Sequence, residues 1–120
     1  FGVSAAFLVV FTYVTRPELL FAFPRERTEL WIMVMVFYPL LSVLPQELIF
    51  RSFFFRRYSG MLPGRMSLVL LSAMAFGIAH VIMNNWVAVI LSTIGGWLFA
   101  TTYARHRSLA LVCLEHALYG

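Results

Sequence analysis

The sequence predicts an all-α fold, a polytopic bundle of about five transmembrane helices. Hydrophobic residues make up 62% of the 120 residues, charged residues only 12%, and the mean hydropathy is +0.87. An ordinary soluble domain has about 25% charged residues, so this chain has too few of them to cover a water-facing surface. Long apolar runs also alternate with short segments rich in Arg, Gly and Pro, which is typical of repeated membrane crossings.

The first half of the chain predicts a helix, an interfacial loop and a long helical stretch. Residues 1–15 are apolar, whereas residues 16–28 mix aromatic residues with Arg, Glu and two prolines, which favours a segment at the membrane surface. Residues 29–58 exceed the roughly 20 residues of one upright span. Proline removes a hydrogen bond from a helix, so we expect either one long kinked helix or two helices that meet at Pro45.

The second half predicts three more helices. The expected order is a loop over 59–65, a helix over 66–83, a turn at Asn84 and Asn85, a helix over 86–104, a loop over 105–107 and a last helix from Ser108. Gly95 and Gly96 favour close packing between helices, and Ser108 is a suitable N-cap.

We expect a single membrane-embedded domain over residues 1–120, with a motif-bearing core at 30–120. Because the chain begins at Phe1 and ends at Gly120 inside an apolar run, we expect a fragment truncated at both ends. The one cysteine, Cys113, allows no disulfide within the chain. No basic stripe follows one polar face, so we expect no nucleic-acid partner.

Arginine counts predict the orientation in the membrane. All nine basic residues are arginine. Five of them flank the loops 59–65 and 105–107: Arg56, Arg57, Arg65, Arg105 and Arg107. The segment 16–28 holds three, diluted by glutamates. The positive-inside tendency therefore predicts that the loops 59–65 and 105–107 are cytoplasmic.

Glu47 and Arg51 lie four residues apart in an apolar run. A charge at membrane depth is costly unless it is paired or faces a polar cavity, and this spacing places both side chains on one face of a helix. Two further ionisable residues, His80 and His116, lie in later apolar segments. We expect Glu47, His80 and His116 to share one buried cavity.

One carboxylate and two imidazoles can activate water. Glu47 can accept a proton from water, His80 can hold that water or pass a proton to a leaving amine, and His116 can donate to an oxyanion. Arg51 would orient Glu47. The same three residues, Glu47, His80 and His116, could instead bind zinc, although no H-E-x-x-H pair is present, and we favour a site without a cofactor.

Structural alternatives stay open for each of these residues. Glu47 and Arg51 could be a structural ion pair, His80 a cap of its own helix, and His116 with Glu115 polar contacts between helices. Further residues that could line the site also have other roles. Phe76 is suited to packing, and Asn84 and Asn85 to a turn.

Three short motifs resemble the CPBP family of intramembrane proteases, also called the Abi or CAAX-protease family. Its pattern is E-E-x-x-x-R, then F-x-x-x-H, then H-x-x-x-N/D. The chain has QELIFR at 46–51, FGIAH at 76–80 and HALYG at 116–120. The first motif is a variant, since Gln46 replaces the first glutamate. Gly120 stands where the third motif has Asn or Asp.

The resemblance implies an intramembrane endopeptidase. The glutamate pair and the first histidine of the family are taken to activate water, so the base role would move from Gln46 to Glu47. The second histidine, here His116, is taken to form the oxyanion hole with the residue at Gly120, so Asn84, Asn85 or a residue outside the sequence would have to substitute. A glutamic type is favoured and a metalloprotease is the alternative.

We expect hydrolysis of a membrane-associated or prenylated (CAAX-like) protein or peptide. Gln46 and Gly120 motivate an alternative, an inactive member that acts as a membrane scaffold or bacteriocin self-immunity protein. A proton-relay transporter is a third possibility, weakened by the lack of inverted repeats. The expected location is a bacterial cytoplasmic membrane, and the expected partners are the lipid bilayer and the substrate.

Overall fold

The computed structural model describes residues 2–119, apart from the side chains of Ser4 and Leu8, and every regular element in that range is helical. This confirms the predicted all-α class. The chain divides into two compact units, residues 1–38 and 39–120, each described by itself. A single domain over 1–120 stays a prediction.

The first unit contains α1 and a series of short turns that lead into α3. Its elements are α1 (Gly2–Thr15), η1 (a 3₁₀ turn, Pro17–Leu19), α2 (Ala22–Glu26) and α3 (Thr28–Phe37). The predicted loop over 16–28 therefore contains helical turns. Pro17 stands at the first position of η1, where its missing N–H costs nothing, and Phe21 adopts a left-handed conformation with φ 58°.

The long stretch Thr28–Tyr58 is one helical segment of 31 residues, so the alternative of two separate helices is wrong. After α3 it continues as η2 (Tyr38–Val43), α4 (Leu44–Glu47), η3 (Leu48–Phe53) and α5 (Phe54–Tyr58). Both η2 and η3 are π-helical turns. Pro39 and Pro45 lack the N–H that an α-helix needs, and wide π turns accommodate such interruptions and frequently accompany functional sites. Glu47 ends the short α-helical piece between the two π turns.

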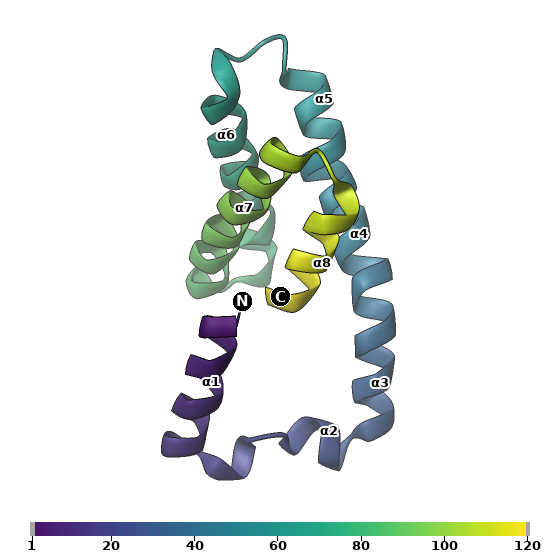
Figure 1. Cartoon of the computed structure of the whole chain (residues 1–120), viewed down its shortest axis with the longest axis vertical. Helices are drawn as coiled ribbons and strands as arrows, with labels where there is room; N and C mark the ends of the chain where they lie inside the picture. Colours follow the sequence, from purple (N-terminus) through teal and green to yellow (C-terminus); the bar gives the residue numbers. More distant parts are fainter. Residues whose placement is uncertain (1, 120) are drawn as a thin grey trace. The chain divides into compact units, whose positions relative to one another are not determined.

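The remaining elements form the rest of the second unit (Figure 1). They are α6 (Gly64–Ala79), η4 (a 3₁₀ turn, His80–Met83), α7 (Trp86–His106) and α8 (Leu109–Tyr119). The N-cap predicted at Ser108 is confirmed, since Ser108 Oγ accepts from Leu111 N at 3.3 Å. Asn85, predicted as part of a turn, also caps α7, and its side chain accepts from Val87 N at 3.0 Å. Asn84 (φ 50°) and Arg107 (φ 52°) end η4 and α7 in the left-handed conformation.

Three of the helical segments are long and apolar enough to cross a membrane: Thr28–Tyr58, Gly64–Met83 and Trp86–His106. Ala5–Thr15 and Leu109–Tyr119 are shorter apolar helices. Most of their large apolar side chains are exposed, as expected of helices that contact lipid. The chain is an integral membrane protein, and the lipid bilayer is its surroundings.

Two glycines allow α6 and α7 to pack closely. A Cβ at Gly77 of α6 would overlap the side chain of Thr93 of α7. A Cβ at Gly96 of α7 would lie 3.1 Å from Phe76 Cδ1 and 3.2 Å from the Ala73 carbonyl oxygen. This confirms the small-residue packing predicted for Gly96. Gly95 has only an ordinary contact with Phe99.

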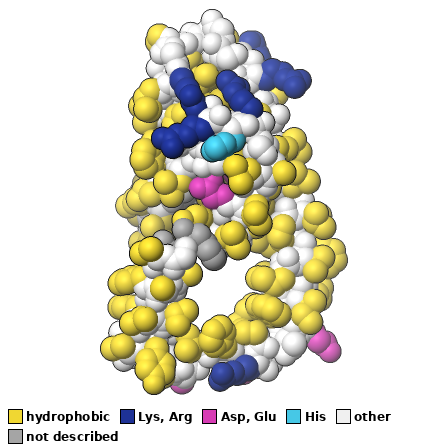
Figure 2. Space-filling view, viewed as in Figure 1, with side chains coloured by type: hydrophobic (Ala, Val, Ile, Leu, Met, Phe, Trp, Pro, Cys, Tyr) yellow, Lys and Arg dark blue, Asp and Glu magenta, His cyan; other side chains and the backbone are white. Residues whose placement is uncertain are grey.

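The core of the second unit is aromatic and apolar, and basic side chains gather at one end. Its buried members are Phe55, Leu68, Val69, Phe76, Phe99, Ala100, Tyr103, Ala104 and Val112. Figure 2 shows dark-blue arginine side chains together at the end of this unit that carries the loops, while hydrophobic side chains cover most of the face in view.

Candidate active site

The helix with Glu47 contributes a fully buried ion pair to the middle of the second unit. Glu47 and Arg51 are both 0% exposed, and Glu47 Oε2 lies 3.1 Å from Arg51 Nε, without the alignment of a hydrogen bond. Two charges four residues apart on one helix can pair in this way. Removing one member of a buried pair leaves the other charge uncompensated, which typically costs about 3–5 kcal/mol.

His116 of α8 completes the cluster from a distant part of the sequence. Its Nδ1 lies 2.8 Å from Glu47 Oε1, and the side chain is almost fully buried. Because an ionised carboxylate can only accept hydrogen bonds, Nδ1 must carry the proton. One oxygen of Glu47 therefore binds an imidazole and the other faces a guanidinium.

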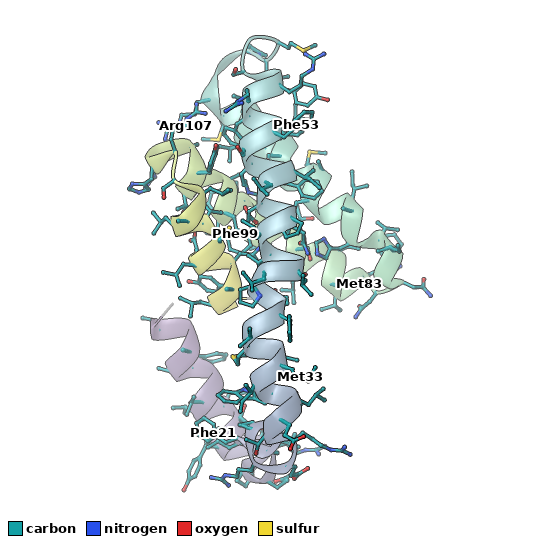
Figure 3. The ribbon with its side chains drawn as sticks, turned by 90° about the vertical axis from the view of Figure 1, so that its right-hand side faces the viewer. Phe21, Met33, Phe53, Met83, Phe99 and Arg107 are labelled. Atoms are coloured by element: carbon teal, nitrogen blue, oxygen red, sulfur yellow. The ribbon has the colours of Figure 1, made fainter. Side chains whose placement is uncertain are left out.

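Aromatic rings enclose this cluster. The His116 ring stacks on Phe99, which is labelled in Figure 3. The two ring centroids are 4.7 Å apart, and His116 also meets Phe76 edge-on at 5.5 Å. The Arg51 guanidinium carbon lies 5.0 Å from the Phe76 centroid and 5.9 Å from that of Phe99. A cation over an aromatic face is stabilised by the ring quadrupole, so Phe76 and Phe99 replace part of the lost hydration of Arg51.

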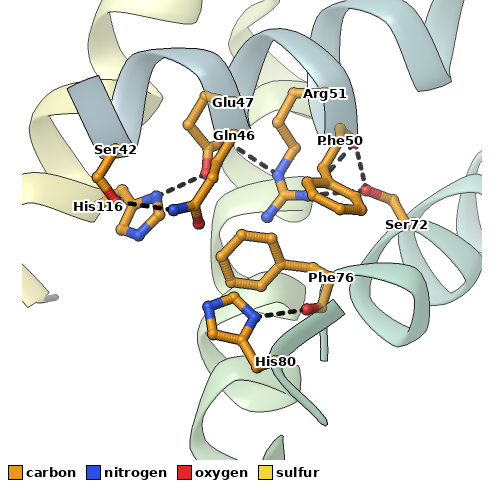
Figure 4. Close-up of polar contacts among 9 residues, drawn as sticks. All are labelled: Ser42, Gln46, Glu47, Phe50, Arg51, Ser72, Phe76, His80 and His116. Carbon is orange, nitrogen blue, oxygen red and sulfur yellow. Dashed lines mark hydrogen bonds and ion pairs between the residues drawn. The ribbon is translucent and has the colours of Figure 1, made fainter. Parts of the chain in front are cut away.

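His80 does not contact Glu47 directly. Its Nδ1 lies 2.7 Å from the Phe76 carbonyl oxygen, and its ring packs on the Phe76 ring with centroids 4.7 Å apart. In Figure 4 the Phe76 ring lies between His80 and the Glu47–Arg51 pair. The structure thus joins Glu47, Arg51 and His116 by direct contacts, and joins His80 to them through Phe76.

A cavity shared by Glu47, His80 and His116 stays a prediction. Two cavities lined by described residues have about 490 and 370 Å³. The first lies between α5 and α6, the second along η3 and α5, and neither is lined by Glu47, His80 or His116. Glu47, Arg51 and His116 themselves form a cluster of direct contacts.

Gln46 occupies the position next to the buried glutamate. It is half-buried, and its Nε2 donates to Ser42 Oγ at 2.9 Å. Its Oε1 is buried and has no hydrogen-bond partner within residues 2–119. Gly120, the last position of the third motif and the second departure from the family pattern, lies outside the described residues.

Asn84 and Asn85 serve the turn between η4 and α7. Both are exposed, and Asn85 caps α7. They line a small cavity of about 40 Å³ with Val81, Trp86 and Val89. Their described contacts therefore match the turn-forming alternative.

Ser72 belongs to the site although the sequence did not single it out. It is 0% exposed, accepts from Arg51 Nη1 at 2.9 Å and donates to the Phe50 carbonyl oxygen at 2.6 Å. The only sequence signal was a hydroxyl one turn before Phe76, on the face of α6 that carries the second motif. Phe99 was likewise missed, because an apolar residue in an apolar helix carries no distinguishing pattern.

The predicted zinc ligands do not form a metal site in this arrangement. In the part of the chain that the structure describes, no three His, Cys, Asp or Glu side chains are grouped so that they could hold a metal. Glu47 faces Arg51 and His116, whereas His80 directs Nδ1 at a backbone carbonyl. A role for zinc stays an untested prediction.

Comparisons with known proteins agree with the motifs. A search of curated proteins and a search of solved structures gave no match. The family model described as "Type II CAAX prenyl endopeptidase Rce1-like" matches residues 27–120, which include all the site residues named above. The chain belongs to this Rce1-like family of CAAX prenyl endopeptidases, and is thus a membrane protein of a protease family.

Proposed function

We propose that this chain is an intramembrane endopeptidase that hydrolyses a peptide bond in a membrane-associated or prenylated protein or peptide. The observation that carries the proposal is the hydrogen bond between Glu47 and His116. It joins the first and third motifs across 69 residues, and Phe76 of the second motif contacts both Arg51 and His116. Ionisable side chains are costly to place inside a bilayer, so a buried group of them there is a candidate for a functional site.

His80 is the group we propose as the proton acceptor. A carbonyl oxygen can only accept, so Nδ1 of His80 is protonated and Nε2 of the neutral ring carries the lone pair. His80 is half-buried, whereas Glu47 is 0% exposed with both oxygens engaged. Nε2 takes a proton from the attacking water and returns it to the amine of the leaving peptide.

Glu47 orients the other groups in this proposal. Its negative charge holds the His116 ring and the Arg51 guanidinium, as a carboxylate does for a catalytic imidazole. To stabilise the negative oxygen of the tetrahedral intermediate, His116 must also carry a proton on Nε2, so that Nε2 donates to the oxyanion while Nδ1 donates to Glu47. The sequence-based alternative, with Glu47 as the base, requires water to reach an enclosed carboxylate.

Cleavage of a prenylated reporter peptide by the chain in proteoliposomes tests the proposal. His80→Ala should lower kcat by about 10²–10⁴-fold, the usual contribution of a general base. Glu47→Gln keeps a hydrogen-bond acceptor but removes the charge, so kcat should fall less in this variant than in His80→Ala. His106→Ala, in the exposed end of α7, is the matched control and should cleave normally. Wild-type rates in His80→Ala would refute His80 as base, and complete loss only in Glu47→Gln would restore Glu47 to that role.

The same assay tests whether hydrolysis depends on zinc. The site as described has no three-ligand group, so we propose hydrolysis without a metal. Activity should survive dialysis against a chelator and should not rise when Zn²⁺ is added. Loss on chelation that Zn²⁺ reverses would establish the metalloprotease alternative.

A second function, an inactive scaffold or immunity protein, is favoured by one observation. Gln46 replaces a family glutamate, and the remaining glutamate is fully enclosed. Under this proposal Glu47→Gln leaves binding or immunity unchanged, and the wild-type chain cleaves none of the reporter peptides.

A further inference from the structure

The hydroxyl of Ser72 makes contacts of a different kind from those of Ser67, Thr93 and Thr101, three other hydroxyls in the described helices. Ser67, Thr93 and Thr101 each donate to the carbonyl four residues earlier in their own helix, which is the usual habit of Ser and Thr inside helices. Ser72 instead donates to the Phe50 carbonyl, 22 residues away in η3. Its orientation is therefore set by another segment of the fold.

Ser72 also fixes the rotation of the Arg51 side chain. Arg51 Nη1 donates to Ser72 Oγ at 2.9 Å and lies 3.3 Å from the Phe50 carbonyl oxygen. The guanidinium is planar, so holding Nη1 also determines where Nε points. Nε faces Glu47 Oε2 at 3.1 Å.

A continuous series of contacts then reaches His116. Ser72 binds Arg51, Arg51 pairs with Glu47, and Glu47 accepts from His116 Nδ1. All four side chains are buried, three of them with 0% exposure. Since no water solvates them from outside, a shift of one side chain leaves its neighbours with unmatched polar groups.

We propose that Ser72 is a positioning residue of the active site, which acts through Arg51 and Glu47 to hold His116. This inference rests on the proposed endopeptidase function for its kinetic consequence. Its structural consequence, the orientation of the His116 ring, is independent of that function.

The first test measures cleavage by the full chain in proteoliposomes. Ser72→Ala should lower kcat on the order of 100-fold, the effect of a small misplacement of catalytic groups, with KM changed less than about twofold because Ser72 touches no substrate. Ser67→Ala removes a hydroxyl from the same helix that bonds only its own Pro63 carbonyl, and should cleave like the wild type. A Ser72→Ala variant with wild-type kcat would overturn the proposal.

The second test records the imidazole N–H signals of the chain, ¹⁵N-labelled at histidine, in detergent micelles. The chain has three histidines, and His116→Gln identifies the signal of the Nδ1 proton bound to Glu47. This signal should shift or broaden in Ser72→Ala and stay unchanged in Ser67→Ala. An unchanged signal in Ser72→Ala would refute the positioning role even if the wild-type chain cleaves no peptide, so this readout separates the failure of the inference from the failure of the proposed function.

Ser72→Cys covers the case in which Ser72→Ala fails to fold. It keeps nearly the same volume and offers only a weak hydrogen bond. An altered His116 signal and a lowered kcat in this variant support the proposal, and wild-type values for both overturn it.

Discussion

The carboxylate of Glu47 has a proton donor on one oxygen and a cation beside the other. In this buried position both contacts are stronger than at a surface, so they hold the Glu47 side chain in one rotamer. This suits an anion that orients partners better than a base that must take up a proton. Under the proposed function, proton transfer therefore falls to the half-buried His80, and Gln46 is a second half-buried position, next to Glu47 in the sequence.

Replacement of Gln46 by Glu should raise activity. An amide cannot accept a proton from water, whereas a carboxylate at the same position can, and Ser42 would then donate to it in place of accepting from Gln46 Nε2. We expect a rise in kcat of about 100-fold, at the lower end of the contribution of a general base. The measurement is cleavage of the reporter peptide, with Gln46→Ala as the control for lost side-chain contacts. Equal rates in the Glu variant and the wild type would mean that position 46 takes no part in water activation.

The sequence indicated the charged members of the site and the Glu47–Arg51 pair, but not the hydrogen bond between Glu47 and His116. Glu47 and Arg51 could be predicted as a pair because a helix dictates the four-residue spacing. The Glu47–His116 contact spans 69 residues and depends on how α8 packs, which no local pattern records. His80 is separated from Glu47 because the bulky Phe76 ring occupies the space between His80 and the Glu47–Arg51 pair.

At the scale of the elements, the ends of the helices were easier to predict than their interiors. Ser108 caps α8 by a local hydrogen bond, as predicted, because residue type and position are sufficient signals for an N-cap. The π turns η2 and η3 were not predicted, because their wide geometry results from prolines and packing together. Only the prolines that interrupt the stretch, Pro39 and Pro45, were visible in the sequence.

The packing of α6 on α7 predicts opposite outcomes for two adjacent glycines. Gly96→Ala places a methyl group 3.1 Å from Phe76 and 3.2 Å from the Ala73 carbonyl, and overpacking of this kind costs about 1–3 kcal/mol. Gly95→Ala meets only Phe99 at ordinary contact distance and should be neutral or slightly stabilising, since alanine favours helix. Thermal unfolding in detergent should show a lower Tm for Gly96→Ala alone. Similar Tm values for the two variants would mean that α6 and α7 are not in close contact at Gly96.

At the scale of the whole molecule, the arginines outside the site divide into two groups with different surroundings. Arg56, Arg57, Arg65, Arg105 and Arg107 are exposed around the loops of the second unit. Within this group, Arg107 lies 5.6 Å from the Phe55 ring and 5.9 Å from that of Tyr103. A long side chain can thus cover apolar rings and keep its charge at the membrane surface. Arg16, Arg25 and Arg27 lie close to three glutamates, Glu18, Glu26 and Glu29, so the net charge of residues 16–29 is zero.

This asymmetry predicts the orientation of the chain. We propose a bacterial cytoplasmic membrane with the loops between α5 and α6 and between α7 and α8 in the cytoplasm, because arginine-rich loops are retained on that side. Single cysteines at Ser59 and at Leu19, both exposed, report on the two sides in a Cys113→Ala background. In intact cells, a membrane-impermeant maleimide should label Leu19→Cys and should label Ser59→Cys only after the membrane is permeabilised. The reverse pattern would place the arginine-rich loops outside, and labelling of both positions in intact cells would mean that Thr28–Tyr58 does not cross the membrane.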